Sequence, residues 1–309
     1  MKKLNIDWGG IEDKTGFLFS FAKSLSAAVK NSPYSDLCED IIATSGFAFR
    51  MWVDPDVLCP SATSIWDFES QKKWVENGGL ICDYVGRYWE QDDIEEERRR
   101  KATEIIKESI DRGIPAVSWD IGVPEWGLII GYNDEESSFE ALSIMGEYLK
   151  MPYEILGKRE IPILSVLTVT GRQDKSREDI YHDTLKTAIS HLRGKEWCDN
   201  NRSGLEAYPA LMAFFDGKYS QDLSWNMEYY LGTYGALKYY AYRYFEKVGS
   251  NDLAALYKKV YSNWIEAFGI KRNEDINDMK VRERINALLK DSYECEIGAA
   301  ELMERETGA

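Results

Sequence analysis

The distribution of helix and strand patterns along the chain limits what it can fold into. Up to about residue 170, helical periodicity alternates with runs of β-branched and aromatic residues, whereas from residue 176 onward only helical patterns occur. We therefore predict an α+β domain over residues 1–172 and an all-helical domain over residues 173–309. The 309 residues are enough for two domains of roughly 150 residues each.

Three helices are predicted in the first domain. Residues 15–30 place apolar side chains three and four positions apart, beginning with Phe17 and Phe21, which is typical of an amphipathic helix with one buried side. A glycine follows each of the other two patterns, where a helix is expected to end. These two helices cover residues 35–44 and 94–112.

The strand patterns of the first domain predict an antiparallel meander on which these helices pack. The apolar run over residues 126–132 ends at Asn133 and Asp134, which favour a turn. Further strands are expected over residues 80–85, 114–119 and 161–170, with a weaker one over 137–142.

The second domain is predicted to consist of five helices. Ser176 is a good N-cap for the first of them, and Gly249 is expected to end the third. Eleven of the 19 tyrosines lie between Tyr208 and Tyr261, and we interpret them mainly as helix-packing residues. These helices could also cover a cleft or form the face of a homodimer. The five helices span residues 177–193, 204–215, 221–248, 252–268 and 278–290.

Charge and composition exclude several classes of partner. With 38 basic and 53 acidic residues the formal charge is −15, which argues against nucleic acid or an anionic membrane as the partner. No segment reaches the ~18 apolar residues of a membrane span, and no apolar stretch follows Lys2 and Lys3 as in a secretory signal. The five cysteines are scattered and form no C-x-x-C pair. We therefore expect free thiols and a cytoplasmic protein.

The chain has only two histidines, which limits the chemistry that it can perform. His182 and His191 are nine residues apart and would face opposite sides of a helix, so they cannot share a metal ion. The glycines form no phosphate-binding loop. We expect neither a metal nor a cofactor.

Three segments of the first domain carry a resemblance to a known family. Residues 20–30, the stretch Ser45 to Arg50 and the stretch Gly113 to Asp134 resemble the N-terminal domain of the butirosin biosynthesis protein H family. That family is a branch of the papain-like fold, to which bacteriocin-processing cysteine peptidases also belong. The resemblance implies a papain-like first domain and acyl transfer from a carrier protein to an aminoglycoside amine.

The catalytic residues that the resemblance implies are replaced in this chain. The family's cysteine at the start of the first buried helix falls at Ser20, its histidine falls at Glu125, and the orienting Asp or Asn falls near Glu140. A carboxylate becomes a useful base only if burial or a like charge raises its pKa, and Asp120 could supply that charge. We predict that Ser20 and Glu125 contact each other, and we interpret them as a degenerate catalytic pair.

These substitutions favour a non-catalytic protein that binds a small amine, peptide or acyl ligand in the former cleft. Trp126, Asp120 and Tyr132 are the expected ligand contacts. The alternative is an acyltransferase, or an amide or thioester hydrolase, that uses Ser20 with Glu125, or Cys59. Pro60 would place Cys59 at the start of a helix, where the dipole favours a thiolate, although a buried turn residue is the simpler interpretation.

Overall fold

The computed structural model describes residues 1–64 and 66–308, which form two compact units. The predicted boundary at residue 172 lies close to the last crossing between the units, after Lys175. Two earlier segments, however, belong with the C-terminal helices and make both units discontinuous. The sheet unit comprises Met1–Ile11, Ser20–Ile41 and Asp67–Lys175, and the helical unit comprises Glu12–Phe19, Ile42–Trp66 and Ser176–Ala309.

The sheet unit is built on one antiparallel sheet, which confirms the predicted α+β class. The strand order is β3-β8-β4-β5-β6-β7, and β1 pairs with β5 beyond the end of β4. The strands are β1 (Lys2–Lys3), β3 (Leu80–Arg87), β4 (Ala116–Ser118), β5 (Gly127–Asn133), β6 (Ser138–Leu142), β7 (Tyr148–Pro152) and β8 (Leu164–Arg172).

The place of β8 differs from the predicted meander. Strands β4 to β7 follow one another, but β8 returns to lie between β3 and β4. Its residues from Leu164 to Val169 are all buried, as expected for a central strand that is covered on both faces. The strand β7, which the sequence analysis missed, takes the edge instead, where Lys150 and Pro152 suit an exposed position.

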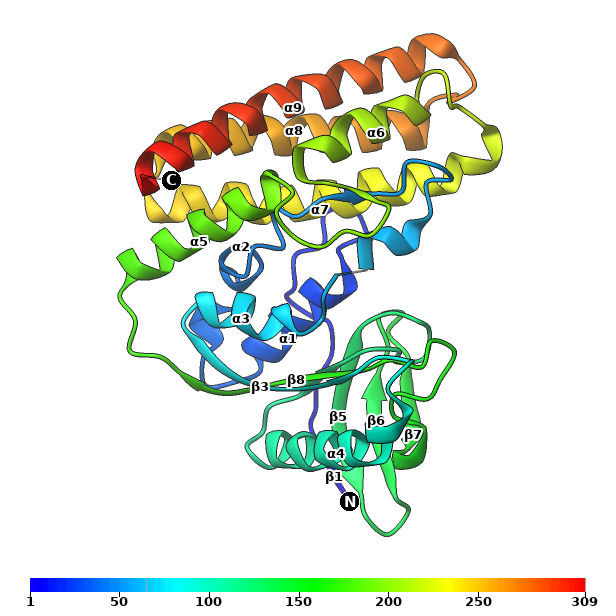
Figure 1. The fold of residues 1–309 in the computed structure, drawn as a ribbon, viewed down its shortest axis with the longest axis vertical. Coiled ribbons are helices and arrows are strands. Elements are labelled where there is room, and N and C mark those ends of the chain that lie inside the picture. The colour runs from blue at the N-terminus through cyan, green and yellow to red at the C-terminus, as the bar shows by residue number, and fades with distance from the viewer. Residues whose placement is uncertain (65, 309) are drawn as a thin grey trace. The chain divides into compact units, whose positions relative to one another are not determined.

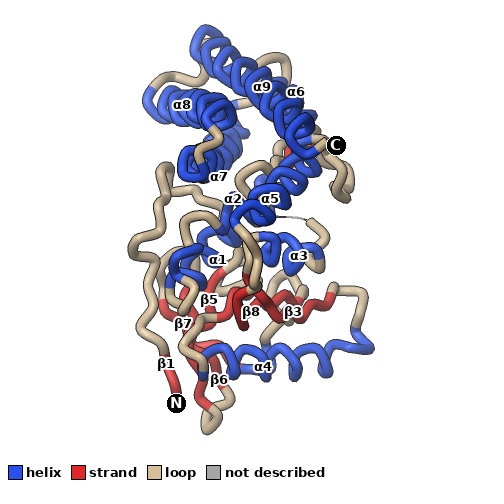
Figure 2. The backbone as a smooth tube through the Cα atoms, turned by 90° about the vertical axis from the view of Figure 1, so that its left-hand side faces the viewer, coloured by secondary structure: helices blue, strands red, loops and turns tan. Residues whose placement is uncertain are grey.

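Helices cover both faces of this sheet (Figure 2). Helices α1 (Ser20–Lys30) and α3 (Ser70–Asn77) lie on one face, and α4 (Glu95–Asp111) lies on the other. Residues of α4 share a buried apolar cluster with four strand residues. Val85 of β3 pairs with Val166 of β8, and Ala116 of β4 pairs with Ile129 of β5. The α4 residues in that cluster are Ala102, Ile105, Ile106 and Ile110.

The first helix is shorter than its apolar pattern predicts. It begins at Ser20, and the carboxylate of Asp13 instead holds a turn by accepting the backbone N–H groups of Gly16 and Leu18. Gly16 has φ +82°, a left-handed conformation that cannot continue an α-helix. The assignment of Phe17 to the buried face of this helix is therefore wrong, and the segment Glu12–Phe19 belongs to the helical unit.

The helical unit contains the three longest helices of the protein (Figure 1). The hydroxyl of Ser176 caps α5 by accepting the N–H of Asp179 at 3.0 Å, and Gly249 ends α7 at φ +79°, as predicted. A short ribbon pairs β2 (Trp52–Val53) with β9 (Arg202–Ser203). The helices are α5 (Arg177–Leu192), α6 (Ala207–Phe214), α7 (Ser224–Val248), α8 (Asn251–Asn273) and α9 (Met279–Thr307).

Short helices complete both units. The helix predicted over residues 35–44 is divided into a 3-10 turn and a single α-helical turn. The α-turn is α2 (Ile41–Thr44), and the 3-10 turns are η1 (Ser35–Leu37), η2 (Pro60–Ser64), η3 (Asp92–Ile94), η4 (Tyr153–Ile155), η5 (Gly204–Glu206) and η6 (Gln221–Leu223).

Candidate functional site

The predicted contact between Ser20 and Glu125 is present in the sheet unit. The Ser20 hydroxyl donates a hydrogen bond to Oε2 of Glu125 and accepts the backbone N–H of Trp126 at 3.3 Å. Ser20 is the first residue of α1 and is only 5% exposed, whereas Glu125 is half-buried. The contact thus joins the start of α1 to the start of β5.

A tight loop between β4 and β5 brings Glu125 to this position. The carbonyl of Glu125 accepts the N–H of Ile121 at 3.1 Å, and its own N–H donates to Val123 at 2.6 Å. Gly122 has φ +82°, and a Cβ at that position would lie 2.6 Å from Cδ1 of Leu149. Only glycine therefore suits this turn.

Asp120 holds the same loop from its other side. Its Oδ1 accepts Nε–H of Arg159 at 3.3 Å, while Nη2 of Arg159 donates to the carbonyl of Gly122 at 3.0 Å. Burial raises the pKa of Asp120 above its usual value, against the opposing charge of Arg159. These contacts give Asp120 a positioning role in the loop that carries Glu125.

Trp126 is a core residue, which corrects its expected role as a ligand contact. Its side chain is 0% exposed and leaves no ring surface for a ligand. The ring centroid lies 4.8 Å from Phe21, 5.2 Å from Phe68 and 5.5 Å from Trp119, each in a T-shaped or tilted arrangement. The cluster anchors the start of β5 beneath α1.

Tyr132 and Glu140 do not join Glu125. Tyr132 is six residues beyond Trp126 along β5, or about 20 Å at the usual strand rise. Its hydroxyl donates to Asp111 at 2.9 Å. Glu140 lies opposite Gly131 in β6 and accepts Nζ of Lys3 at 3.0 Å. The structure therefore does not bring Tyr132, an expected ligand contact, or Glu140, the expected third catalytic position, to Glu125.

The alternative nucleophile Cys59 lies in the helical unit, directly before η2 as predicted. Its Sγ is 2.9 Å from the hydroxyl of Ser61, and its carbonyl accepts the Tyr230 hydroxyl at 2.7 Å. The carboxylate of Asp54 accepts the N–H of Cys59 at 3.3 Å. Because η2 is a 3-10 turn of five residues, the dipole that would favour a thiolate is small.

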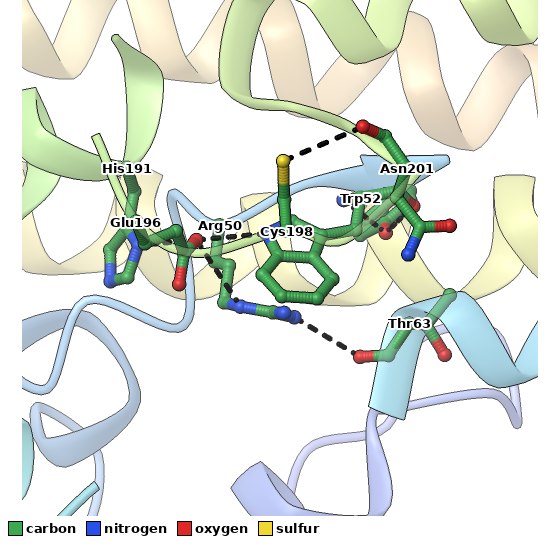
Figure 3. A network of polar contacts seen from close by, with 8 residues as sticks. Arg50, Trp52, Thr63, His191, Glu196, Cys198 and Asn201 are labelled. Atoms are coloured by element: carbon green, nitrogen blue, oxygen red, sulfur yellow. Dashed lines mark hydrogen bonds and ion pairs between the residues drawn. The ribbon is translucent and has the colours of Figure 1, made fainter. Parts of the chain in front are cut away.

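The helical unit contains a buried polar cluster that the sequence analysis missed (Figure 3). Oε1 of Glu196 accepts the indole N–H of Trp52 at 2.9 Å, and it lies 3.0 Å from Nδ1 of His191 and 3.4 Å from Nε of Arg50. The guanidinium of Arg50 is buried 3.9 Å above the Trp52 ring and donates to the Thr63 carbonyl at 3.2 Å. The cluster joins β2 to the segment that follows α5.

The electrostatics of this cluster are those of a structural anchor. Burial raises the pKa of Glu196, but the charges of Arg50 and His191 outweigh it and hold that pKa at about 2. Figure 3 shows the thiol of Cys198 pointing to the Asn201 carbonyl, 3.5 Å away, rather than to His191. No local sequence pattern points to Arg50 or Glu196, because these two residues are far apart in the chain and meet only in the folded unit.

Comparisons with known proteins add no family to these observations. No protein-family model matches the chain, and no curated protein matches it significantly. Among residues 1–64 and 66–308, no three His, Cys, Asp or Glu side chains form a group able to hold a metal ion. None of the helices described here combines the length and apolar character needed to cross a lipid bilayer.

Proposed function

We propose that this chain is a non-catalytic member of the papain-like group, similar to the butirosin biosynthesis protein H family, that binds a small amine, peptide or acyl ligand beside Glu125. The observation that carries the proposal is the pair of hydrogen bonds that the Ser20 hydroxyl makes. This hydroxyl donates to the Glu125 carboxylate and accepts the Trp126 N–H, so both of its hydrogen-bonding roles hold the fold together.

The chemistry of the pair supports binding over catalysis. A serine nucleophile requires a base whose pKa lies near the working pH, and imidazole usually fills that role. Both histidines lie in α5 of the helical unit, whereas Ser20 and Glu125 belong to the sheet unit. The partner of Ser20 is instead a carboxylate, which is a weak base at neutral pH because the ordinary pKa of a glutamate is about 4.3.

Among the three ligand classes, the charge at this loop favours an amine. Glu125 is a half-buried carboxylate that follows the exposed Val123 and the half-buried Pro124 in the turn. An ammonium group would gain a charge-assisted hydrogen bond there, whereas an acyl carboxylate would be repelled. The formal charge of −15 also attracts cationic ligands over a longer range.

Binding and turnover measurements with defined probes test this proposal. Kanamycin serves as the amine, N-acetylcysteamine thioesters serve as the acyl probe, and p-nitrophenyl acetate reports hydrolysis. We expect E125Q to weaken kanamycin binding at least tenfold, while S20A and the control S24A, from the buried side of the same helix, retain it. We expect S20A and C59A to leave the background hydrolysis unchanged.

Two outcomes would contradict the proposal. Turnover of either acyl probe that disappears in S20A or in C59A would establish the acyltransferase or hydrolase alternative and identify its nucleophile. Kanamycin binding that E125Q leaves unchanged would remove Glu125 from the ligand site.

A further inference from the structure

The segment Glu12–Phe19, here called the strap, lies along α7 and α8 within the helical unit; it is part of the dark-blue chain in Figure 1. The Thr15 hydroxyl donates to the carbonyl of Gly232 at 2.8 Å, and the Tyr240 hydroxyl donates to the carbonyl of Glu12 at 2.8 Å. Both bonds pair a side chain with backbone. The strap is therefore attached as a bound peptide would be, without forming a helix or strand with its neighbours.

The strap has a shape of its own. Oδ1 of Asp13 accepts the N–H of Gly16 at 2.9 Å and that of Leu18 at 3.1 Å, and Gly16 supplies the left-handed turn. The Thr15 hydroxyl accepts the N–H of Phe17 at 3.1 Å. These bonds lower the entropy cost of presenting Lys14, Thr15 and Phe17 in one fixed arrangement.

Phe17 is the residue of the strap that packs against both α7 and α8. Its ring makes T-shaped contacts with Tyr229 of α7 at 5.8 Å and with Phe268 of α8 at 5.9 Å. At Gly232 the ring reaches the helix backbone, because a Cβ there would lie only 2.6 Å from Cδ2 of Phe17. The absence of a side chain at Gly232 is thus matched to the aromatic ring.

Lys14 makes the second contact, with an aromatic ring. Its Nζ lies 4.7 Å from the centroid of Tyr239, and Tyr261 packs against Tyr239 at 5.4 Å. An ammonium over a tyrosine face is a favourable cation–π arrangement, worth about 0.5 to 1 kcal/mol at an exposed site. Lys14 and Phe17 are three residues apart, and the α7 rings that receive them, Tyr239 and Tyr229, are about three helical turns apart.

The receiving residues form one surface, which we call the strap face. On α7, Gly232 follows Tyr229 by three residues and Tyr239 follows Gly232 by seven. On α8, Phe268 follows Tyr261 by seven residues. These spacings place the residues along one side of each helix. The strap face consists of Tyr229, Gly232, Tyr239, Tyr261 and Phe268.

We propose that the strap is a releasable intramolecular ligand, and that the strap face recognises peptides in which a cation precedes an aromatic residue by three positions. The seated strap itself identifies this partner chemistry. Glu12, Lys14 and Gly16 are exposed and Phe17 is half-buried, whereas Leu18 and Phe19 are buried, with the Phe19 ring 5.6 Å from that of Trp66. Residues 12–17 are therefore the part of the strap that can be released, and Leu18 and Phe19 stay fixed. The tether keeps its effective concentration in the millimolar range, and a partner peptide must compete with it. This inference does not depend on the Ser20–Glu125 site.

Two glycines of α7 provide a matched test of how the strap is held. A Cβ at Gly232 would collide with Phe17, whereas a Cβ at Gly235 would meet its nearest atoms at 3.6 Å, an ordinary contact. We expect G232A to accelerate both hydrogen exchange over residues 12–19 and tryptic cleavage after Lys14 at least tenfold, and G235A to change neither. Equal exchange and cleavage in the two variants would overturn the proposal.

A peptide with the sequence of residues 12–19 tests recognition by the strap face. We expect F17A, in which the strap is weakened but the strap face is intact, to bind this peptide at least tenfold more tightly than the wild-type chain does. The same peptide with Phe17→Ala is the control and should not bind. If F17A fails to fold, as judged by circular dichroism, T15A loosens the strap through its bond to Gly232 instead. The absence of peptide binding to a folded, strap-weakened variant would overturn the proposal.

Discussion

The two units contain polar pairs in very different surroundings. In the helical unit, Nζ of Lys238 on α7 lies 2.7 Å from Oε1 of Glu296 on α9, and the two side chains are 0% and 1% exposed. In the sheet unit, Ser20 meets the half-buried Glu125 at the end of a surface turn. The charges of Lys238 and Glu296 therefore lie inside helix packing, whereas the carboxylate of Glu125 remains partly exposed.

Burial makes the helical pair costly to disturb rather than reactive. The phenols of Tyr208 and Tyr257 are also fully buried near Glu296, and burial, together with that carboxylate's charge, raises the pKa of each well above its usual value. Such a cluster is stable as a unit, but the loss of one partner leaves an uncompensated charge in a low-dielectric core. The comparison teaches that a fully buried ion pair holds helices together in one unit, whereas in the other unit a hydroxyl and a partly exposed carboxylate join a helix to a strand.

The largest effect is expected from K238M. Removing the ammonium while Glu296 stays buried should lower the free energy of unfolding by about 3 to 5 kcal/mol. The double variant K238M/E296Q removes both charges and should recover more than half of that loss, as measured by urea denaturation. Equal destabilisation by the single and the double variants would show that the charge imbalance is not the cause.

A smaller loss of stability is expected when the pH is lowered and the Glu196 carboxylate becomes protonated. Its pKa of about 2 in the folded protein is below the ordinary 4.5, so the ionised carboxylate stabilises the fold above pH ~4.5. That contribution, about 3 kcal/mol, should be lost as the pH falls from about 4.5 to about 2. E196Q should be less stable at pH 7 and should show a flatter pH dependence of stability over this window.

An exposed glutamate of α5, Glu178, provides the control for this measurement. E178Q should keep both the stability at neutral pH and the wild-type slope below pH 4.5. If E196Q retains the full wild-type acid dependence, other carboxylates account for that slope.

The Ser20 contact should matter less for stability. S20A leaves the Trp126 N–H and the Glu125 carboxylate without this hydroxyl, which should cost about 2 kcal/mol in chemical denaturation. S24A removes a buried hydroxyl of the same helix and serves as the comparison. A cost for S20A no larger than that for S24A would mean that the hydroxyl does not hold α1 to β5.

The smallest difference is expected in the alkylation rates of the three half-buried thiols. Cys38, Cys59 and Cys198 are half-buried, whereas burial raises the pKa of Cys82 and of Cys295. Iodoacetamide near neutral pH should therefore label the first three at similar rates and the last two more slowly. Labelling of Cys59 at least tenfold faster than Cys38 would instead support the Cys59 enzyme alternative.

Local sequence signals determined much of the secondary structure. Ser176 and Gly249 mark helix ends because a capping hydroxyl and a left-handed glycine act within a few residues of the chain. The confinement of β-branched runs to the first part likewise predicted where the sheet lies. The pairing of Ser20 with Glu125 was also predicted, but through the resemblance to a family rather than through spacing.

Only the tertiary structure decided the rest, because it depends on residues distant in the chain. Phe17 fits the apolar period of α1, yet Gly16 and the turn at Asp13 take it to α7 and α8. The position of β8 depends on its partners on either side. Lys238 stands in a tyrosine-rich run that gives no sign of burial, and its buried partner is 58 residues away. Periodicity shows which side of an element is apolar, but it does not show which distant side chain will meet a buried charge.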